Sequence, residues 1–177
     1  MGNDHTLDAF FDFCNNDSSA NYHSTAYLMD NIFGSENPVV GITEHGPQFV
    51  GVRDVKRLFD ELINSFSRLV LLPQLSAIGN VPVLSSRRLY SQDHSTIGVQ
   101  TILAGTHVRK WFPDPKDSHY SPPLSTIDPD GAHKMEIPAC AVFTFDGDHK
   151  ISRLQIYLDR YKLGQQLKPA AATARAH

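Results

Sequence analysis

Hydrophobic residues recur at every third or fourth position in the first third of the chain, and this spacing predicts three helices. The first covers residues 6–14, and the second, with a weaker apolar stripe, covers residues 19–33. The third covers residues 51–67 and has the cleanest stripe, because charged residues fill its opposite side. The residues expected to be buried on this helix and just after it are Leu58, Phe59, Leu62, Ile63 and Phe66. A short strand or bent ribbon, residues 38–49, is expected between the second and third helices.

Alternation of apolar and polar residues replaces the helical spacing in the second half of the chain, and it predicts an antiparallel hairpin. Residues 134–146 form its first strand, and Gly147 lies in the turn. On the return strand, one face carries Leu154, Ile156 and Leu158, and the other carries Arg153, Gln155, Tyr157 and Asp159. That second face lines either solvent or a cavity with a polar floor.

Further strands are predicted before the hairpin. One or two short edge strands are expected within residues 69–84, another at 87–92, and a long one at 95–109 with Gly98 and Gly105 as bulge or bend points. Residues 113–132 contain several prolines and are expected to form an exposed loop, and residues 160–167 a last helical turn or two. Helices gathered before strands indicate an α+β fold, in which about three N-terminal helices cover one face of a strongly bent, mostly antiparallel sheet.

Length and composition favour a single domain. We expect residues 1–167 to form it and residues 168–177 to be a flexible tail. The net charge is −3 and no basic cluster is interleaved with aromatic residues, so no nucleic-acid partner is expected. The longest aliphatic run has four residues, too few to span a membrane. No signal peptide is visible, which predicts a cytoplasmic protein in which Cys14 and Cys140 are buried thiols rather than a disulfide.

Several short motifs, in their order along residues 5–167, resemble the SnoaL-like branch of the NTF2-like superfamily. They include Gly105-Thr106-His107 on the long strand, Phe145-Asp146-Gly147 in the hairpin, and Asp159 followed by Gln166-Leu167. The chain departs from the pattern at Arg153 and Gln155, where the family commonly has Glu and Trp. The resemblance implies a cone of bent sheet closed by helices around a largely apolar cavity. It also implies a homodimer formed through the open face of the sheet, and relatives that include polyketide cyclases, isomerases and dehydratases.

The resemblance makes Asp159 the first candidate for chemistry, as a general acid–base on an enolising substrate. A carboxylate inside an apolar cone would have a raised pKa, which suits proton transfer near neutral pH. The alternative is that Asp159 caps the helix that begins at the next residue. His107 is the second catalytic candidate, since a neutral imidazole could polarise a carbonyl or orient Asp159. Its alternative is a histidine that is hydrogen-bonded within the sheet.

Four further residues are candidates for binding substrate oxygens: Tyr157, Gln155, Tyr22 and His23. The remaining histidines lack the spacing of a metal site, and no phosphate-binding or dinucleotide-binding glycine motif occurs, so no metal and no cofactor are expected. Two functions stay open. The first is a cofactor-free enzyme of cyclase, isomerase or dehydratase type that acts on a small hydrophobic, oxygenated molecule. The second is a non-catalytic module that binds a ligand or dimerises.

Overall fold

The computed structural model of the chain describes residues 2–15, 24–34, 37–42, 48–73, 75–78, 81–86, 88–108 and 133–167. The predicted loop at 113–132 and the predicted tail at 168–177 lie outside these residues. The fold is α+β, as predicted, with helices before the long strands. The elements follow in this order: α1 (Asn3–Asn15), α2 (Thr25–Tyr27), a π-helical turn η1 (Leu28–Ile32), β1 (Val39–Ile42), β2 (Gln48–Val50), α3 (Val52–Ser65), β3 (Phe66–Pro73), β4 (Leu75–Ile78), β5 (Val81–Ser86), β6 (Arg88–Tyr90), β7 (Thr96–His107), β8 (His133–Phe145), β9 (Ile151–Leu158) and α4 (Arg160–Leu167).

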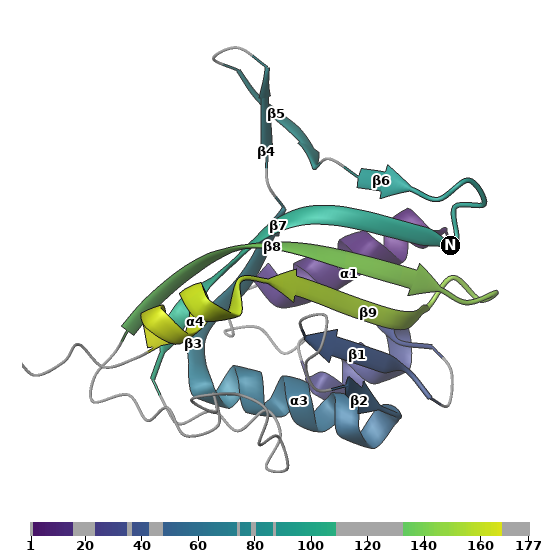
Figure 1. The fold of residues 1–177 in the computed structure, drawn as a ribbon. Coiled ribbons are helices and arrows are strands. Elements are labelled where there is room, and N and C mark those ends of the chain that lie inside the picture. The colour runs from purple at the N-terminus through teal and green to yellow at the C-terminus, as the bar shows by residue number, and fades with distance from the viewer. Residues whose placement is uncertain are drawn as a thin grey trace, which may run out of the picture.

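A bent, seven-stranded sheet forms the body of the molecule (Figure 1). Its order is β2-β1-β9-β8-β7-β3, and β6 pairs with β7 on the same edge as β3. The pairing of β1 with β9 is parallel, and the other pairings are antiparallel. Strands β4 and β5 form a separate two-stranded sheet. The predicted hairpin is therefore confirmed as β8 and β9, at the centre of the sheet.

The two faces of the sheet differ sharply in burial. Side chains on the inner face of the long strands face the helices, and α1 lies behind these strands in Figure 1. The inner face carries fully buried apolar residues, among them Ile97, Val99, Ile137, Ala141, Phe143 and Leu154. The residues between them along the strands point to the outer face, where Glu136, Pro138, Arg153 and Tyr157 are exposed. The period-2 pattern of the sequence therefore separates core from surface.

A cluster of phenylalanine rings fills the interior between α1, the loop after η1, α3 and β8. Phe10 of α1 is at its centre, with ring centroids 5.2 Å from Phe143 and 6.3 Å from Phe59. Phe11 and Phe33 also meet the Phe10 ring edge to face, at 6.0 and 6.2 Å. Such edge-to-face pairs add to the free energy gained from burial alone. This cluster joins segments from both halves of the chain into one core.

Helix α3 begins and ends close to its predicted bounds. Gly51 precedes it with φ of +87°, a conformation that side-chain-bearing residues rarely adopt, and its carbonyl accepts the first helical hydrogen bond, from Val55 N at 3.0 Å. Burial of Leu58, Phe59 and Phe66 is confirmed, and Leu62 is partly buried. The prediction for Ile63 was wrong, because its side chain is 49% exposed. The apolar stripe is wider than the strip of helix that the sheet covers.

Polar contacts tie α1 to the edge strand β6. The guanidinium of Arg88 donates to both Asp4 and Asp8, which lie one helical turn apart on α1, and the Tyr90 hydroxyl donates to Asp4 at 2.9 Å. Burial raises the pKa of the Asp4 carboxyl, but the hydrogen bonds from Arg88 and Tyr90 outweigh this effect and leave that pKa below its ordinary value. The network anchors the end of the sheet where β6 lies.

Gly98 and Gly105 were predicted as bulge or bend points; neither is a bulge in the pairing of β7 with β8, which runs from Thr96 to His107 without a register shift. The irregularity lies instead in β3, where the pairing shifts between Ser67 and Val70 opposite Gly105. Among the residues described, no helix has the length and apolar character needed to cross a membrane.

Candidate functional site

Asp159 lies at the junction of β9 and α4 and caps the helix. Its carboxylate oxygen Oδ1 accepts a hydrogen bond from Lys162 N at 3.0 Å, and its carbonyl accepts one from Leu163 N at 2.9 Å. These are the bonds of a helix N-cap, the second of the two roles expected for this residue. The side chain is exposed, so the carboxylate lies in solvent and not in the apolar interior.

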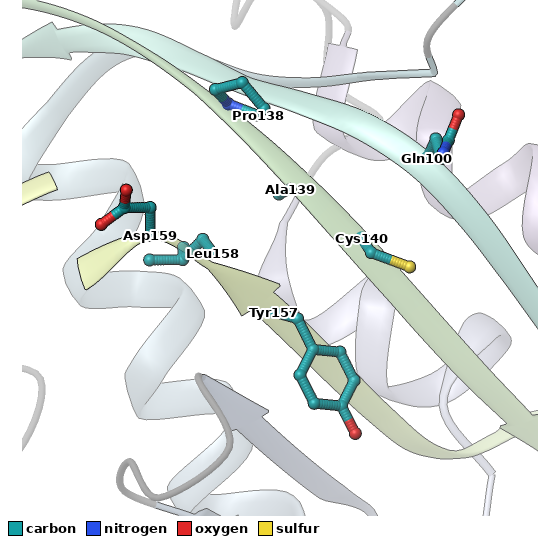
Figure 2. A pocket seen from close by; sticks show the side chains of 7 residues that line it. All are labelled: Gln100, Pro138, Ala139, Cys140, Tyr157, Leu158 and Asp159. Carbon is teal, nitrogen blue, oxygen red and sulfur yellow. The ribbon is translucent and has the colours of Figure 1, made fainter. Parts of the chain in front are cut away.

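Tyr157 lies on the outer face, two residues before Asp159, and both residues line an open hollow of about 400 Å³ (Figure 2). The hollow extends over β7, β8 and β9, and the sticks of Figure 2 show Gln100, Cys140 and Tyr157 on three neighbouring strands. We call it the outer hollow; its lining is Gln100, Pro138, Ala139, Cys140, Tyr157, Leu158 and Asp159. The predicted polar face of the return strand therefore points away from the helices.

Gln155 shares this face but is buried, with only 8% of its surface exposed. It pairs with Gly41 on the neighbouring parallel strand β1. A Cβ atom at Gly41 would lie 2.2 Å from Gln155 Oε1, so the glutamine side chain occupies the space that the glycine leaves. The position of Gln155 is therefore fixed by packing against β1.

His107 is the sequence-predicted residue that lies in the interior. It ends β7 on the inner face, and its side chain is fully buried. The Phe66 ring lies beside the imidazole, with 4.9 Å between centroids and an angle of 30° between the ring planes. Phe66 is also its partner across the β3–β7 pairing, so the backbone register fixes this contact. The imidazole of His107 is therefore enclosed by protein and shielded from bulk water.

Two polar residues in the last turns of α3 were missed by sequence reasoning. Ser65, at the end of α3, is buried. Its carbonyl accepts a hydrogen bond from Val108 N at 2.9 Å, and Val108 is the residue that follows His107. Glu61 lies one helical turn before Ser65, and its Oε2 atom is buried. The signal is present in the sequence, because Glu61 and Ser65 follow Leu58 by three and seven residues and so share its buried side. We call Glu61, Ser65 and His107 the inner polar cluster.

The structure does not bring His107 and Asp159 together. His107 pairs with His133 on β8, whereas Leu158, the residue before Asp159, pairs with Ala139. The two partner positions on β8, His133 and Ala139, are six residues apart, which is about 20 Å along a strand. The two side chains also differ in burial, since one is enclosed and the other exposed. An arrangement in which His107 orients Asp159 is therefore not observed.

Tyr22 and His23 lie outside the described residues. Within the described part of the chain, no three His, Cys, Asp or Glu side chains gather as a metal site would require. Both cysteines are free, as predicted, but each residue is only partly buried, whereas buried thiols were expected; the surroundings of the Cys14 sulfur nevertheless desolvate it and raise the pKa of the thiol to about 12.

Comparison with solved structures identifies the fold. A proposed SnoaL-like polyketide cyclase from Jannaschia sp. CCS1 matches with a TM-score of 0.64 and 11% identity, over 93% of this chain and 90% of that one. A proposed polyketide cyclase from Pseudomonas putida KT2440 matches with a TM-score of 0.62 and 16% identity, over 94% of this chain and 98% of that one. A protein from Catenulispora acidiphila DSM 44928 with a ketosteroid isomerase-like fold was solved in complex with trimethylamine. It matches with a TM-score of 0.57 and 8% identity, over 91% of this chain and 90% of that one.

No protein-family model matches the sequence, and no curated protein matches it significantly. The likeness to these solved structures shows that the chain has a SnoaL-like fold, as the sequence motifs predicted, and at these identities the likeness concerns the fold alone.

Proposed function

We propose that the chain is a SnoaL-like, cofactor-free enzyme that moves a proton on a small hydrophobic, oxygenated molecule. The observation that carries this proposal is the fully buried imidazole of His107 on the inner face of the cone. In this proposal His107 is the group that takes or gives the proton, because imidazole does both near neutral pH. Cyclase, isomerase and dehydratase reactions all contain such a step.

Glu61 is the carboxylate of this proposal. Its Oε2 atom is buried and it lies one helical turn from Ser65, at the same end of α3 as His107. A buried carboxylate near an imidazole can stabilise the imidazolium that forms when the histidine takes a proton, and Ser65 adds a buried hydroxyl. Asp159 keeps the capping role that its hydrogen bonds support.

The rest of the inner wall supports an apolar ligand. The inner-face residues of β8 are all apolar from Met135 to Phe145, and those of β9 are all apolar from Leu154 to Leu158. The polar groups that could bind a ligand oxygen therefore come from β7 and α3. Apolar walls with a few placed polar groups are typical of sites for small hydrophobic ligands. We therefore expect a substrate that is mostly hydrocarbon, with a carbonyl or hydroxyl oxygen at the His107 end.

The test is deuterium exchange at carbon. Purified protein is incubated in D₂O with a panel of hydrophobic ketones and β-keto esters, and exchange of the α-protons is followed by NMR. This readout detects enolisation whatever the later product is. The wild type is expected to accelerate exchange of at least one compound, and His107→Gln and Glu61→Gln to slow it by about 100-fold or more. Asp54→Asn, an exposed carboxylate on the same helix, is the control and should exchange like the wild type.

A second candidate is the non-catalytic module, favoured by the phenylalanine cluster that fills much of the interior. Native mass spectrometry of the purified protein separates the two functions. A bound small molecule that the wild type holds without exchange or conversion, and that His107→Gln holds equally, would establish the module and overturn the enzyme.

A further inference from the structure

The hydroxyl of Thr101 is buried in the interior and makes no hydrogen bond within the part of the chain that the structure describes. The residue is 0% exposed and lies on the inner face of β7, on the same side as Val99 and His107. The large majority of buried polar side-chain atoms have a hydrogen-bond partner, because a buried group without one lowers the stability of the fold. This loss is recovered when a bound molecule supplies the partner.

The sheet around Thr101 does not supply that partner. At this position β7 is paired on both sides, with Ala139 of β8 and with Pro73 of β3, so the backbone groups nearby serve the sheet. The neighbours of Thr101 along the inner face of β7 are the apolar residues Val99 and Leu103. Ala139, directly opposite on β8, offers only a methyl group. The hydroxyl is thus left to a group that comes from the interior of the cone.

Thr101 and His107 lie towards the two ends of one wall. They are six residues apart on the inner face of β7, which is at most about 20 Å along the strand. Both residues are fully buried, whereas Leu103, between them on the same face, is only partly buried. Solvent therefore reaches the wall between the two polar groups. An elongated apolar molecule that lies along β7 can present one oxygen to each of them.

We propose that Thr101 is a substrate-binding residue, whose hydroxyl holds an oxygen at the far end of an elongated, mostly hydrocarbon substrate while His107 acts at the near end. The inference rests on the proposed function, in which His107 transfers the proton. It adds a second oxygen group to the substrate, separated from the first by a chain that spans this wall. A threonine hydroxyl both donates and accepts, so the far group is a hydroxyl or a carbonyl. The apolar neighbours of Thr101 disfavour a charged group, which would be buried without a counter-charge.

The first measurement is the denaturation temperature of the free protein. Valine has the shape of threonine without the hydroxyl, so Thr101→Val should raise this temperature by about 2–8 °C, because the unpartnered group is removed. Thr106→Val is the control, since Thr106 is half-buried on the outer face of the same strand, and it should shift the temperature by less than about 2 °C. A Thr101→Val variant that is no more stable than the wild type shows that the hydroxyl already has a partner inside the protein, and overturns the proposal.

The second measurement uses linear methyl ketones of increasing chain length, each prepared with and without a hydroxyl group at the far end. Binding is followed as the rise in denaturation temperature with ketone concentration, and α-proton exchange is followed separately by NMR. In the wild type, the far hydroxyl should tighten binding about 10-fold at the chain length that spans the wall, and lower KM for exchange at unchanged kcat. Thr101→Val should lose this preference for the far hydroxyl. Thr101→Ser, which restores a hydroxyl, and Thr106→Val should both keep it.

This inference and the proposed function fail in different ways. Binding that prefers the far hydroxyl through Thr101, with no exchange of any ketone, supports the role of Thr101 and overturns the proton transfer. Exchange without that preference at any chain length, or a preference that persists in Thr101→Val, overturns the role of Thr101 and does not affect the proposed function. A wild type that binds no ketone of either series also overturns the role of Thr101.

Discussion

The side chain of Gln166 satisfies both backbone groups of Glu136. Its Oε1 atom accepts a hydrogen bond from the Glu136 N–H at 2.8 Å, and its Nε2 atom donates to the Glu136 carbonyl at 3.1 Å. Strand β9 ends at Leu158, opposite Ala139, so this part of β8 extends beyond its neighbour. Helix α4 continues along that edge, and one glutamine amide takes the place of the missing strand.

Replacing Gln166 by Ala should therefore lower the free energy of unfolding by about 1 kcal/mol, because two hydrogen bonds at a partly solvated edge are lost. Gln165 is the matched control: it is exposed on the same helix, and its replacement by Ala should change stability by less than about 0.5 kcal/mol. Urea denaturation of both variants measures the difference. Equal stability of the two would remove the edge-capping role from Gln166.

Asp159 gives a second prediction, which follows from its hydrogen bond to Lys162 N. Asparagine is an equally good N-cap, so Asp159→Asn should be as stable as the wild type. Asp159→Ala should lose about 1 kcal/mol. Thermal or urea denaturation measures both variants, and deuterium exchange on a ketone substrate is measured beside them. Loss of deuterium exchange in Asp159→Asn at unchanged stability would show that this carboxylate takes part in the proton transfer.

The helices and long strands were predictable because their apolar residues repeat at 3.6 and 2 residues over long segments. The inner and outer faces of β9 were separable too, since Leu154 and Tyr157 fall on opposite sides of the pleat. The sequence left open which of these faces meets the helices. The role of Asp159 was left open for a related reason. If β9 ended one residue later, Asp159 would be a strand residue facing a cavity, whereas with the strand ending at Leu158 it is the N-cap of α4.

The inner polar cluster was missed because Glu61 was assigned by its charge to the solvent side of α3, although its spacing from Leu58 fits the buried side. Burial depends on which part of the helix the sheet covers, and that is a tertiary property. The prediction for Ile63 was wrong in the opposite direction, because this apolar residue was expected to be buried and is exposed. Strands β4 and β5 fall within the predicted edge strands, and the chain leaves the main sheet between the pairings of Pro73 with Thr101 and of Arg88 with Val99.

Two apolar residues of α3 that differ in burial test this assignment of faces. Leu58 is 1% exposed and Ile63 is 49% exposed. Leu58→Ala should cost about 2–5 kcal/mol, since it removes a buried side chain and leaves a cavity. Ile63→Ala should change stability by less than about 0.5 kcal/mol, as at an ordinary surface position. Equal losses measured by urea denaturation would mean that the helix is rotated from the position described above.

The contact of Asp4 with Arg88 predicts a pH dependence. The folded-state pKa of Asp4 is lowered, so its contribution to stability is present above the pKa of the unfolded chain, about 4, and is lost as pH falls through the lowered value. Asp4→Asn should therefore be less stable than the wild type at pH 7, by about 0.5–1 kcal/mol because the carboxylate is half exposed. The difference should shrink below pH 3. A constant difference at both pH values, measured by urea denaturation, would assign the loss to packing instead of charge.

Gly41 and Gln155 give the sharpest test of the packing between β1 and β9. A Cβ at Gly41 would lie 2.2 Å from Oε1 of Gln155 and 2.8 Å from its Cδ, so Gly41→Ala forces the buried amide to move. Such overpacking should cost about 1–3 kcal/mol. In a Gln155→Ala background the same space is empty, and Gly41→Ala should instead be neutral or stabilising, because alanine loses less conformational entropy than glycine in a strand. The double-mutant cycle should therefore give a coupling of about 1–3 kcal/mol. Additive effects of the two changes, measured by urea denaturation, would show that Gln155 does not occupy the space above Gly41.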